Sequence, residues 1–550
     1  MAGESTVAAT LARDLANYGA RRCFALLGTA NFKISHALVE AGVEIISARH
    51  EGNAASMADA YAKATQELTL VSVHSGPGLT NALTGIAEAA KSRTPLLVLA
   101  GDVPAGAVKN NFHFDQAAMA RSVGAVAERI HTPATAREDT LRAVTRALRD
   151  RQTVVLSLPT DVQDAILAGP TPPLALPMAS GPLHPDPESL RRLIGAFETA
   201  KRPVFIAGRG AVISTAEAAI AELADRAGAL LATSVCGHGL FTGDPWNLGI
   251  CGGFASPAAS ELVGESDLIV GFGVSLTHWT TKRGKLIAPG TTVAQIDIEG
   301  PKLGYHTPVD IAVLADARAA AEALLGEFGP KPGARGWRNE RIAARMRDGD
   351  NHHAPYQDVS NAQFIDPRTL SKAVDAMLPR QRVVASDSGH FCGWVPRYLR
   401  VPNARTSCLS HSFQSIGLGL ASAIGLGIAN PGSLAVLGAG DGGFLMSLAD
   451  LETAVRLKLR MCILVYNDSS YAAEVHLYRR RGMSIDIVQF PDTDFAAIGR
   501  GHGARAAIVR TLEDLAPVRD WVREGAPGVF IIDGKISPDL EADWHAEHFP

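Results

Sequence analysis

The sequence lacks the features that would place it in a membrane or in an oxidising compartment. Its six cysteines are scattered and form no Cys-x-x-Cys pair, which argues against a zinc site or a disulfide framework and fits a reducing cytoplasm. No run of about 18 apolar residues occurs, so we expect no transmembrane span. The N-terminal segment has no basic start followed by a long apolar stretch, so we expect no signal peptide.

An excess of charge of one sign is also missing. Lysine and arginine number 52 against 56 aspartates and glutamates, which gives a formal net charge of -4 at pH 7. No cluster of basic residues stands out, so nothing favours a nucleic acid or a membrane surface as a partner. The 47% of hydrophobic and 20% of charged residues are typical of a globular protein with large cores.

Two stretches rich in proline, glycine or charge divide the chain, at residues 168–189 and 329–357. Between them, short β-branched runs alternate with alanine- and leucine-rich stretches, a pattern typical of parallel α/β sheets. We therefore predict an α/β protein with three parallel-sheet domains, at 1–170, 186–330 and 358–545.

A glycine-rich turn in the third segment carries the first chemical signal. LGAGDGGFLMS, residues 437–447, satisfies G-x-G-x-x-G at Gly438, Gly440 and Gly443, a pattern that also occurs in strand-to-helix turns without any ligand. Asp441 sets this turn apart, because a carboxylate there would repel a pyrophosphate unless a cation lay between them.

A second acidic residue follows the next predicted strand. The stretch 444–459 is expected to be helical, and MCILVY at 461–466 forms a strand that ends in NDSSY, residues 467–471. Asp441 and Asp468 therefore lie at the carboxyl ends of successive strands of a right-handed βαβ unit. Asp468 could hold a ribose in a Rossmann site, but two acids suit Mg²⁺, which prefers hard oxygen ligands. The segment predicts a metal–diphosphate site.

These motifs resemble those of a known family. Gly440-Asp441-Gly442 followed at this interval by NDSSY is similar to the GDG…NN motif of thiamine-diphosphate (ThDP) enzymes, with Asp468 where asparagine is usual. The resemblance implies that Asp441, Asp468 and the carbonyl of Ser470 bind Mg²⁺. It implies that the cofactor contacts Glu51, Gln414, Ile416, Gly440, Asp441, Gly442, Gly443, Asp468, Ser470 and Tyr471.

A second motif lies almost four hundred residues earlier. SARHEGNAASMADAYAKAT, residues 47–65, places Glu51 after a predicted strand at the start of a helix, where a glutamate is usually only a partner of the helix dipole. The stretch closely resembles the family's RHE…A…MA.GYA signature, and residues 74–89 resemble the segment that follows it. The resemblance implies that Glu51 drives the imino tautomer of the aminopyrimidine, which deprotonates C2 of the thiazolium.

A third stretch supplies the bend of the cofactor. FQSIGLGLASAIG, residues 413–425, resembles the family segment whose apolar side chain forces ThDP into a V shape. The resemblance places Ile416 as this wedge. Its other interpretation is a core isoleucine at a glycine-rich helix start.

The resemblance covers nearly the whole chain, in the order found in the pyruvate decarboxylase, benzoylformate decarboxylase and acetohydroxyacid synthase group: pyrimidine-binding, central and diphosphate-binding domains. In that group the cofactor lies between the first domain of one subunit and the third of another. The resemblance implies a homodimer at least, with a homotetramer as the expected assembly, and the cysteine usage places it in the cytoplasm. Gly208, Gly210 and Asp297 are too few to indicate a nucleotide site, and we expect no obligatory FAD.

The residues that would distinguish one reaction of this group from another resemble those of more than one enzyme. His74 and His278 fall where benzoylformate decarboxylase carries active-site histidines, whose pKa near neutrality suits proton transfer. Glu474 falls where pyruvate decarboxylase has an acid that helps to protonate the enamine. In isolation each is as often an ordinary polar residue. Further candidates for substrate contact are Thr29 and Asn31, in LLGTANF, and His113, Phe114 and Gln116, in FHFDQ.

The resemblance therefore predicts a ThDP- and Mg²⁺-dependent lyase or carboligase that acts on 2-oxo acids or 2-hydroxy ketones. A C2 carbanion attacks a carbonyl, and the resulting enamine is protonated or added to a second carbonyl. One alternative is acetolactate synthase proper, although YAAEVHL replaces its G-M-V-x-Q-W stretch and His278-Trp279 replaces its central Asp-Arg. A 2-hydroxyacyl-CoA or oxalyl-CoA lyase would need a CoA site that we do not identify. An inactive cofactor-binding regulator is a third alternative, against which Glu51 argues.

Overall fold

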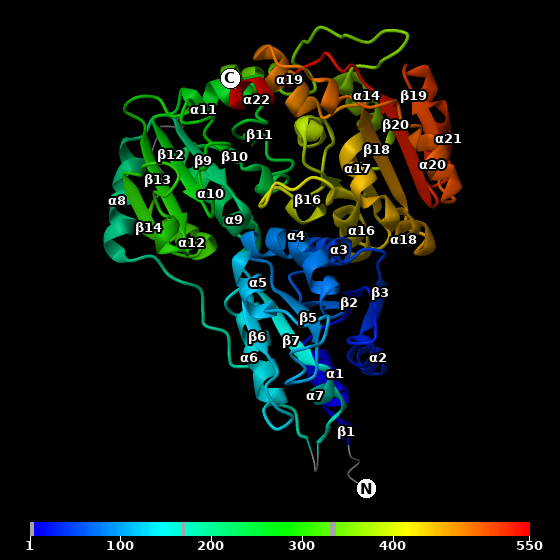
Figure 1. Ribbon diagram of the computed structural model, residues 1–550. Coiled ribbons are helices and arrows are strands. Elements are labelled where there is room, and N and C mark those ends of the chain that lie inside the picture. Colours follow the sequence, from blue (N-terminus) through cyan, green and yellow to red (C-terminus); the bar gives the residue numbers. More distant parts are fainter. Residues whose placement is uncertain (1–4, 168–170, 330–336, 550) are drawn as a thin grey trace.

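The computed structural model describes residues 5–167, 171–329 and 337–549. Figure 1 shows three parallel sheets of six strands, each flanked by helices, arranged so that the first domain lies below the other two. The predicted fold class is confirmed. Within the described ranges, no helix is long and apolar enough to cross a membrane.

The first domain is built on a sheet of order β3-β2-β4-β5-β7-β6. Its central strands β4, β5 and β7 are buried along their whole length, as expected for parallel strands covered on both faces. Its elements are α1 (Val7–Asn17), β2 (Arg22–Ala25), α2 (Phe32–Glu40), β3 (Glu44–Ser47), α3 (Glu51–Thr65), β4 (Thr69–Val73), α4 (Pro77–Lys91), β5 (Leu96–Asp102), α5 (Gln116–Ser122), β6 (Val126–Arg129), α6 (Ala136–Leu148), β7 (Thr153–Pro159) and α7 (Thr160–Asp164), and β1 (Ser5–Thr6) pairs with β8 (Ile166–Leu167).

The central domain has a sheet of order β11-β10-β9-β12-β13-β14 and hydrophobic clusters of its own. It is therefore a separately packed unit. Its elements are α8 (Pro187–Thr199), β9 (Pro203–Ala207), α9 (Arg209–Ile213), α10 (Glu217–Ala227), β10 (Leu230–Thr233), η1 (Val235–Gly237), β11 (Asn247–Ile250), α11 (Pro257–Gly264), β12 (Leu268–Phe272), β13 (Thr292–Asp297), η2 (Gly300–Lys302), β14 (Ile311–Leu314) and α12 (Ala317–Glu327), followed by α13 (Glu340–Asp348).

The third domain has a sheet of order β16-β15-β17-β18-β20-β19. The chain then returns to the central domain, where α22 lies at the junction of the two upper domains (Figure 1). Its elements are α14 (Pro367–Met377), β15 (Arg382–Ser386), η3 (His390–Gly393), α15 (Trp394–Tyr398), η4 (Ala404–Thr406), β16 (Ser407–Leu409), α16 (Gly419–Ala429), β17 (Leu434–Gly440), α17 (Asp441–Ser447), η5 (Leu448–Asp450), α18 (Leu451–Arg456), β18 (Met461–Asn467), α19 (Ala472–Arg480), η6 (Asp486–Val488), α20 (Phe495–Gly501), β19 (Arg505–Val509), η7 (Glu513–Leu515), α21 (Ala516–Arg523), β20 (Val529–Lys535) and α22 (Asp543–His548).

The first and third domains share one hydrophobic core, which runs from strands of the first sheet to strands of the third. Helices α3 and α16 form the contact, and small residues bring their backbones together. A Cβ on Gly425 of α16 would overlap the backbone carbonyl of Met57 in α3. Because this core joins the domains, the relative position of their side chains is set by close packing.

The stretch 444–459 is not one continuous helix, as the sequence suggested. It divides into α17, η5 and α18. At the break, the Asp450 carboxylate accepts hydrogen bonds from the backbone N–H of Arg49 (2.9 Å), just before α3, and from Asn53 Nδ2 (2.6 Å), in its first turn. The prediction of an unbroken helix was wrong because a distant helix recruits this aspartate.

Candidate functional site

The glycine-rich turn lies at the carboxyl end of β17, where Gly440 pairs with Tyr466 of the neighbouring β18. Asp441 is the first residue of α17 and is 9% exposed. Its carboxylate accepts the N–H of Gly442 (2.8 Å). The turn leaves little room, since a Cβ on Gly442 would approach the ring of Tyr471. A residue with a side chain would therefore collide with Tyr471 at this position.

Asp468 lies at the end of the neighbouring strand and is half-buried. Its carboxylate accepts the N–H (3.0 Å) and the hydroxyl (2.9 Å) of Ser470. Asn467, by contrast, points into the domain, where its Nδ2 donates to Asp533 (2.9 Å) and to the carbonyl of Thr493 (3.1 Å). The aspartate, and not the preceding asparagine, therefore faces the turn.

Both carboxylates have a raised pKa. Burial raises the pKa of Asp441, and burial together with repulsion from Asp441 raises the pKa of Asp468. Among the described residues, no group of three His, Cys, Asp or Glu side chains could hold a metal by itself. Two carboxylates and the Ser470 carbonyl are hard oxygen donors that fit Mg²⁺ when a diphosphate supplies further ligands. A cation would also relieve the repulsion.

Glu51 begins α3, after a short connection from β3, and is 8% exposed. Its Oε2 accepts a hydrogen bond from Nδ2 of Asn81 in α4 (3.1 Å). The preceding His50 caps the helix by accepting the N–H of Gly52 (3.0 Å). The carboxylate is thus held at a defined place by two helices, as an acid–base group requires.

The predicted wedge lies on the loop between β16 and α16. Ile416 is 38% exposed, so it is not a core isoleucine. Gln414 adopts a left-handed backbone, with φ of 60°, which is uncommon for a residue with a side chain. Gly417 donates its N–H to both oxygens of Asp387 (3.0 and 2.9 Å), and burial raises the pKa of Asp387 to about 6.

A cavity of about 980 Å³ opens beside this loop. Of the predicted site residues, His278, Gln414 and Ile416 line it, together with Arg93, Arg151, Arg209, Ala473, Trp544 and His545. It therefore lies where all three domains meet. Glu474 follows Ala473 and is exposed in the first turn of α19. Trp279 stacks on His548 of α22, with ring centroids 3.5 Å apart.

His74 and Thr29 meet in the first domain. Nδ1 of the half-buried His74 lies 2.8 Å from the carbonyl of Ser75, and because a carbonyl only accepts, Nδ1 carries the proton. Nε2 lies 3.2 Å from the Thr29 hydroxyl and accepts from it when Nδ1 carries the only ring proton. Phe112 packs edge-on against the imidazole, with centroids 5.1 Å apart. The pair is a potential proton-transfer unit.

Asn31 lies inside the first domain and is fully buried. Its Oδ1 accepts the N–H of Gly28 (2.8 Å), and its Nδ2 donates to the carbonyl of Leu26 (3.1 Å) and to Ser72 (3.0 Å). The side chain thus holds the loop that carries Thr29. Direct contact of Asn31 with a substrate stays a prediction without structural support.

Gln116 is similarly occupied, because it donates to the carbonyl of Gly101 (2.9 Å) and accepts the hydroxyl of Ser157 (2.9 Å). Phe114 packs against the shared core, and only His113 of this group is exposed. The sequence did not single out two residues that hold the site in place, Asn81, which binds Glu51, and Asp387, which binds Gly417. Of them, Asn81 lies within the resembling stretch 74–89, whereas Asp387 carries no local signal.

The site thus combines a pair of carboxylates at the ends of two neighbouring strands, a buried glutamate at the start of a helix, and a loop with an exposed isoleucine beside a cavity. These are parts that a cofactor-dependent enzyme needs. The sequence matches the thiamine pyrophosphate enzyme N-terminal TPP binding domain over residues 5–119, the central domain over 190–324 and the C-terminal TPP binding domain over 387–533. Together these matches cover more than half of the chain. The protein belongs to the thiamine pyrophosphate enzyme family, as its motifs predicted.

Similar proteins span several reactions. Sulfoacetaldehyde acetyltransferase of Rhodobacter capsulatus is 26% identical and covers 96% of this chain and 93% of its own. A probable 2-ketoarginine decarboxylase of Pseudomonas aeruginosa is 28% identical with the same coverage. Acetolactate synthase large subunit of Lactococcus lactis is 28% identical and covers 88% and 85%. The solved structure of a Rhodococcus jostii thiamine diphosphate-dependent 4-hydroxybenzoylformate decarboxylase has the same fold, with a TM-score of 0.82, 20% identity and coverage of 97% and 99%.

Proposed function

We propose that the protein is a ThDP- and Mg²⁺-dependent enzyme that cleaves or forms a carbon–carbon bond next to the carbonyl of a 2-oxo acid or 2-hydroxy ketone. The observation that carries the proposal is the carboxylate pair Asp441 and Asp468 at adjoining strand ends, in a chain whose two outer domains match TPP-binding domains. When bound, ThDP supplies a nucleophilic carbon that attacks carbonyl groups.

The residues of this chain then have separate roles in holding the cofactor. Asp441, Asp468 and the Ser470 carbonyl hold Mg²⁺ and thereby the diphosphate. Ile416 supports the bend of the cofactor. Glu51 holds a proton against the aminopyrimidine ring.

We assign proton transfer to the substrate to three further side chains. His74 accepts or donates at Nε2, next to Thr29. His278 reaches the cavity from the central domain, and Glu474 lies beside a cavity-lining alanine. An imidazole nitrogen that faces a hydroxyl suits proton transfer near pH 7.

The proposal includes assembly into a homodimer at least, with Glu51 of one subunit completing the site of its partner. Light scattering coupled to size exclusion would measure the mass. A monomer that turns over substrate would exclude this arrangement.

The deciding experiment incubates the protein with ThDP, Mg²⁺ and a panel of 2-oxo acids, alone and with aldehyde or 2-oxo acid acceptors. Mass spectrometry follows CO₂ release and coupled products. Aldehyde products mean decarboxylation, and hydroxy ketones or hydroxy acids mean ligation. Acetolactate from pyruvate would identify acetolactate synthase proper.

Two variants test the mechanism. Glu51→Gln keeps the shape and the contact with Asn81 but removes the proton-binding carboxylate, and we expect activity to fall at least 100-fold, a usual contribution of acid–base catalysis. Glu44→Gln, on an exposed position of β3 in the same domain, is the matched control and should keep full activity. Unchanged turnover in Glu51→Gln would refute the mechanism.

A further inference from the structure

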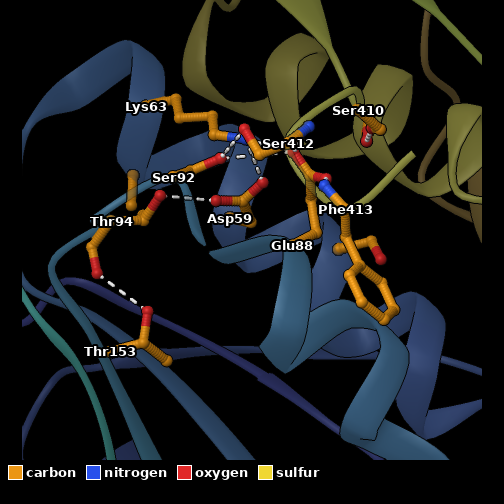
Figure 2. Close-up of polar contacts among 12 residues, drawn as sticks. Asp59, Lys63, Glu88, Ser92, Thr94, Thr153, Ser410, Ser412 and Phe413 are labelled. Carbon is orange, nitrogen blue, oxygen red and sulfur yellow. Dashed lines mark hydrogen bonds and ion pairs between the residues drawn. The ribbon is translucent and has the colours of Figure 1, made fainter. Parts of the chain in front are cut away.

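A buried glutamate of the first domain binds the backbone of the loop that carries Ile416. Glu88, on α4, is 1% exposed. Its Oε2 accepts the N–H of Phe413 (2.7 Å), and its Oε1 accepts the N–H of Ser412 (3.2 Å). Figure 2 shows this carboxylate reaching from the blue first domain to the olive third domain. Two hydrogen bonds thus join chain segments more than 320 residues apart.

A network of polar side chains holds Glu88 in place. Lys63 Nζ lies 3.2 Å from Glu88 Oε1 and 2.5 Å from Asp59 Oδ2. The Ser92 hydroxyl bridges Glu88 (3.2 Å) and the Ser412 hydroxyl (2.7 Å). The remaining oxygen of Asp59 accepts the hydroxyl of Thr94 (2.6 Å) (Figure 2). A carboxylate with this many partners has little freedom to leave the loop.

The loop is thus restrained at two points, with exposed side chains between them. Glu88 binds its N-terminal part, and Asp387 binds the N–H of Gly417. The stretch between includes the left-handed Gln414 and the exposed Ile416. A backbone in this uncommon conformation persists where its surroundings over-determine it. Glu88 is the restraint that comes from another domain.

We propose that Glu88 is a positioning residue for the cofactor. By accepting the N–H groups of Ser412 and Phe413, it sets the backbone course into Gln414 and Ile416, and so fixes the apolar support against which ThDP bends. The proposal rests on the proposed function, which assigns Ile416 to the cofactor. It differs from a purely structural role, because a residue that only joins two domains would affect stability and leave cofactor affinity unchanged.

The test uses Glu88→Gln in the full-length protein. Ser412 and Phe413 donate to different oxygens of the carboxylate, and glutamine replaces one of these oxygens with an NH₂ group that cannot accept, so one of the two N–H groups then faces a donor. Hydrogen–deuterium exchange of the cofactor-free protein should show at least tenfold faster exchange at residues 412–413, with α10 of the central domain unaffected. Calorimetry with ThDP at fixed Mg²⁺ should show a Kd at least tenfold higher than that of the wild type.

Two matched controls separate positioning from stability. Thr94→Val removes a hydrogen bond from Asp59 and leaves the loop N–H groups bound to Glu88. Asp14→Asn weakens another buried carboxylate of the first domain, which pairs with Arg137. Both should lower the melting temperature while the Kd for ThDP stays within twofold of the wild type. An equal loss of affinity in Thr94→Val would overturn the proposal.

The remaining outcomes are also decisive. A Glu88→Gln protein that binds ThDP as tightly as the wild type refutes positioning and leaves the proposed function standing. A wild type that binds no ThDP refutes the proposed function, while exchange still tests the restraint on the loop. Should Glu88→Gln not fold, Glu88→Asp keeps the charge for Lys63 but withdraws the carboxylate by one methylene, with the same expectations. Failure of both variants to fold would mean a global structural role and overturn the proposal.

Discussion

Replacing Lys63 with methionine should destabilise the first domain, because it leaves two buried carboxylates without their cation. The Lys63 side chain is 13% exposed, and those of its partners Asp59 and Glu88 are 1% exposed. Burial lowers the pKa of Lys63, but the attraction of both carboxylates outweighs burial and raises it. Methionine keeps the apolar part of the side chain, so the loss isolates the charge.

Removing one partner of a buried ion pair costs about 3–5 kcal/mol. For a domain of this size, each kcal/mol lowers the melting temperature by about 2–4 °C, so we expect a decrease of roughly 6–20 °C in the cofactor-free protein. Scanning calorimetry at pH 7 measures it. Lys33→Met is the control, because Lys33 and its partner Asp164 are exposed and such pairs contribute at most about 1 kcal/mol.

The loss of stability in Lys63→Met should depend on pH in a defined direction. In the wild type, burial raises the pKa of Glu88, but Lys63 and the N–H groups of Phe413 and Ser412 outweigh burial and lower it. This carboxylate therefore stabilises the fold above its unfolded pKa of 4.5, and the contribution is lost as the pH falls through the lower folded pKa. Without Lys63 the buried carboxylates bind protons more readily in the folded state. The difference in the free energy of unfolding between the wild type and Lys63→Met should thus be largest near pH 7 and should decrease toward pH 4.5.

Two results would contradict this reasoning. A loss of less than about 1 kcal/mol at pH 7 would mean that the carboxylates are solvated or repartnered without Lys63. A deficit that does not change between pH 7 and pH 5 would mean that charge is not its cause.

Two further predictions concern the third domain. Asp441→Asn should abolish Mg²⁺-dependent ThDP binding in calorimetry, while the cofactor-free protein melts at an equal or higher temperature because Asp468 loses a like-charged neighbour; tight binding would refute the metal assignment. Gly425→Ala should lower the free energy of unfolding, measured by denaturant titration, by about 1–3 kcal/mol, because its methyl would overlap the Met57 carbonyl. Gly501→Ala, where a Cβ meets nothing, is its control, and equal stability of the two variants would contradict the packing argument.

Several features could be predicted from the sequence because they depend on neighbouring residues. Strand β18 was expected at 461–466 and is found at Met461–Asn467. The approach of Asp441 and Asp468 follows from parallel strands, whose carboxyl ends meet at one edge of a sheet. The outer domains were recognised from motifs of this local kind.

Other features depend on contacts between distant segments. The break at Asp450 depends on Arg49 and Asn53, some 400 positions away, and no helical periodicity encodes such a partner. The assignment of Asn31 and Gln116 to internal hydrogen bonds likewise required the packed sheet.

By itself, the sequence determined the α/β class, the family and the carboxylate pair, since alternating patterns and short motifs act over a few residues. Only the tertiary structure decided which helices unite the first and third domains, and that Glu88 binds the loop of Ile416. The physical reason is that close packing brings these groups together. A buried carboxylate must then find hydrogen-bond donors wherever the fold presents them.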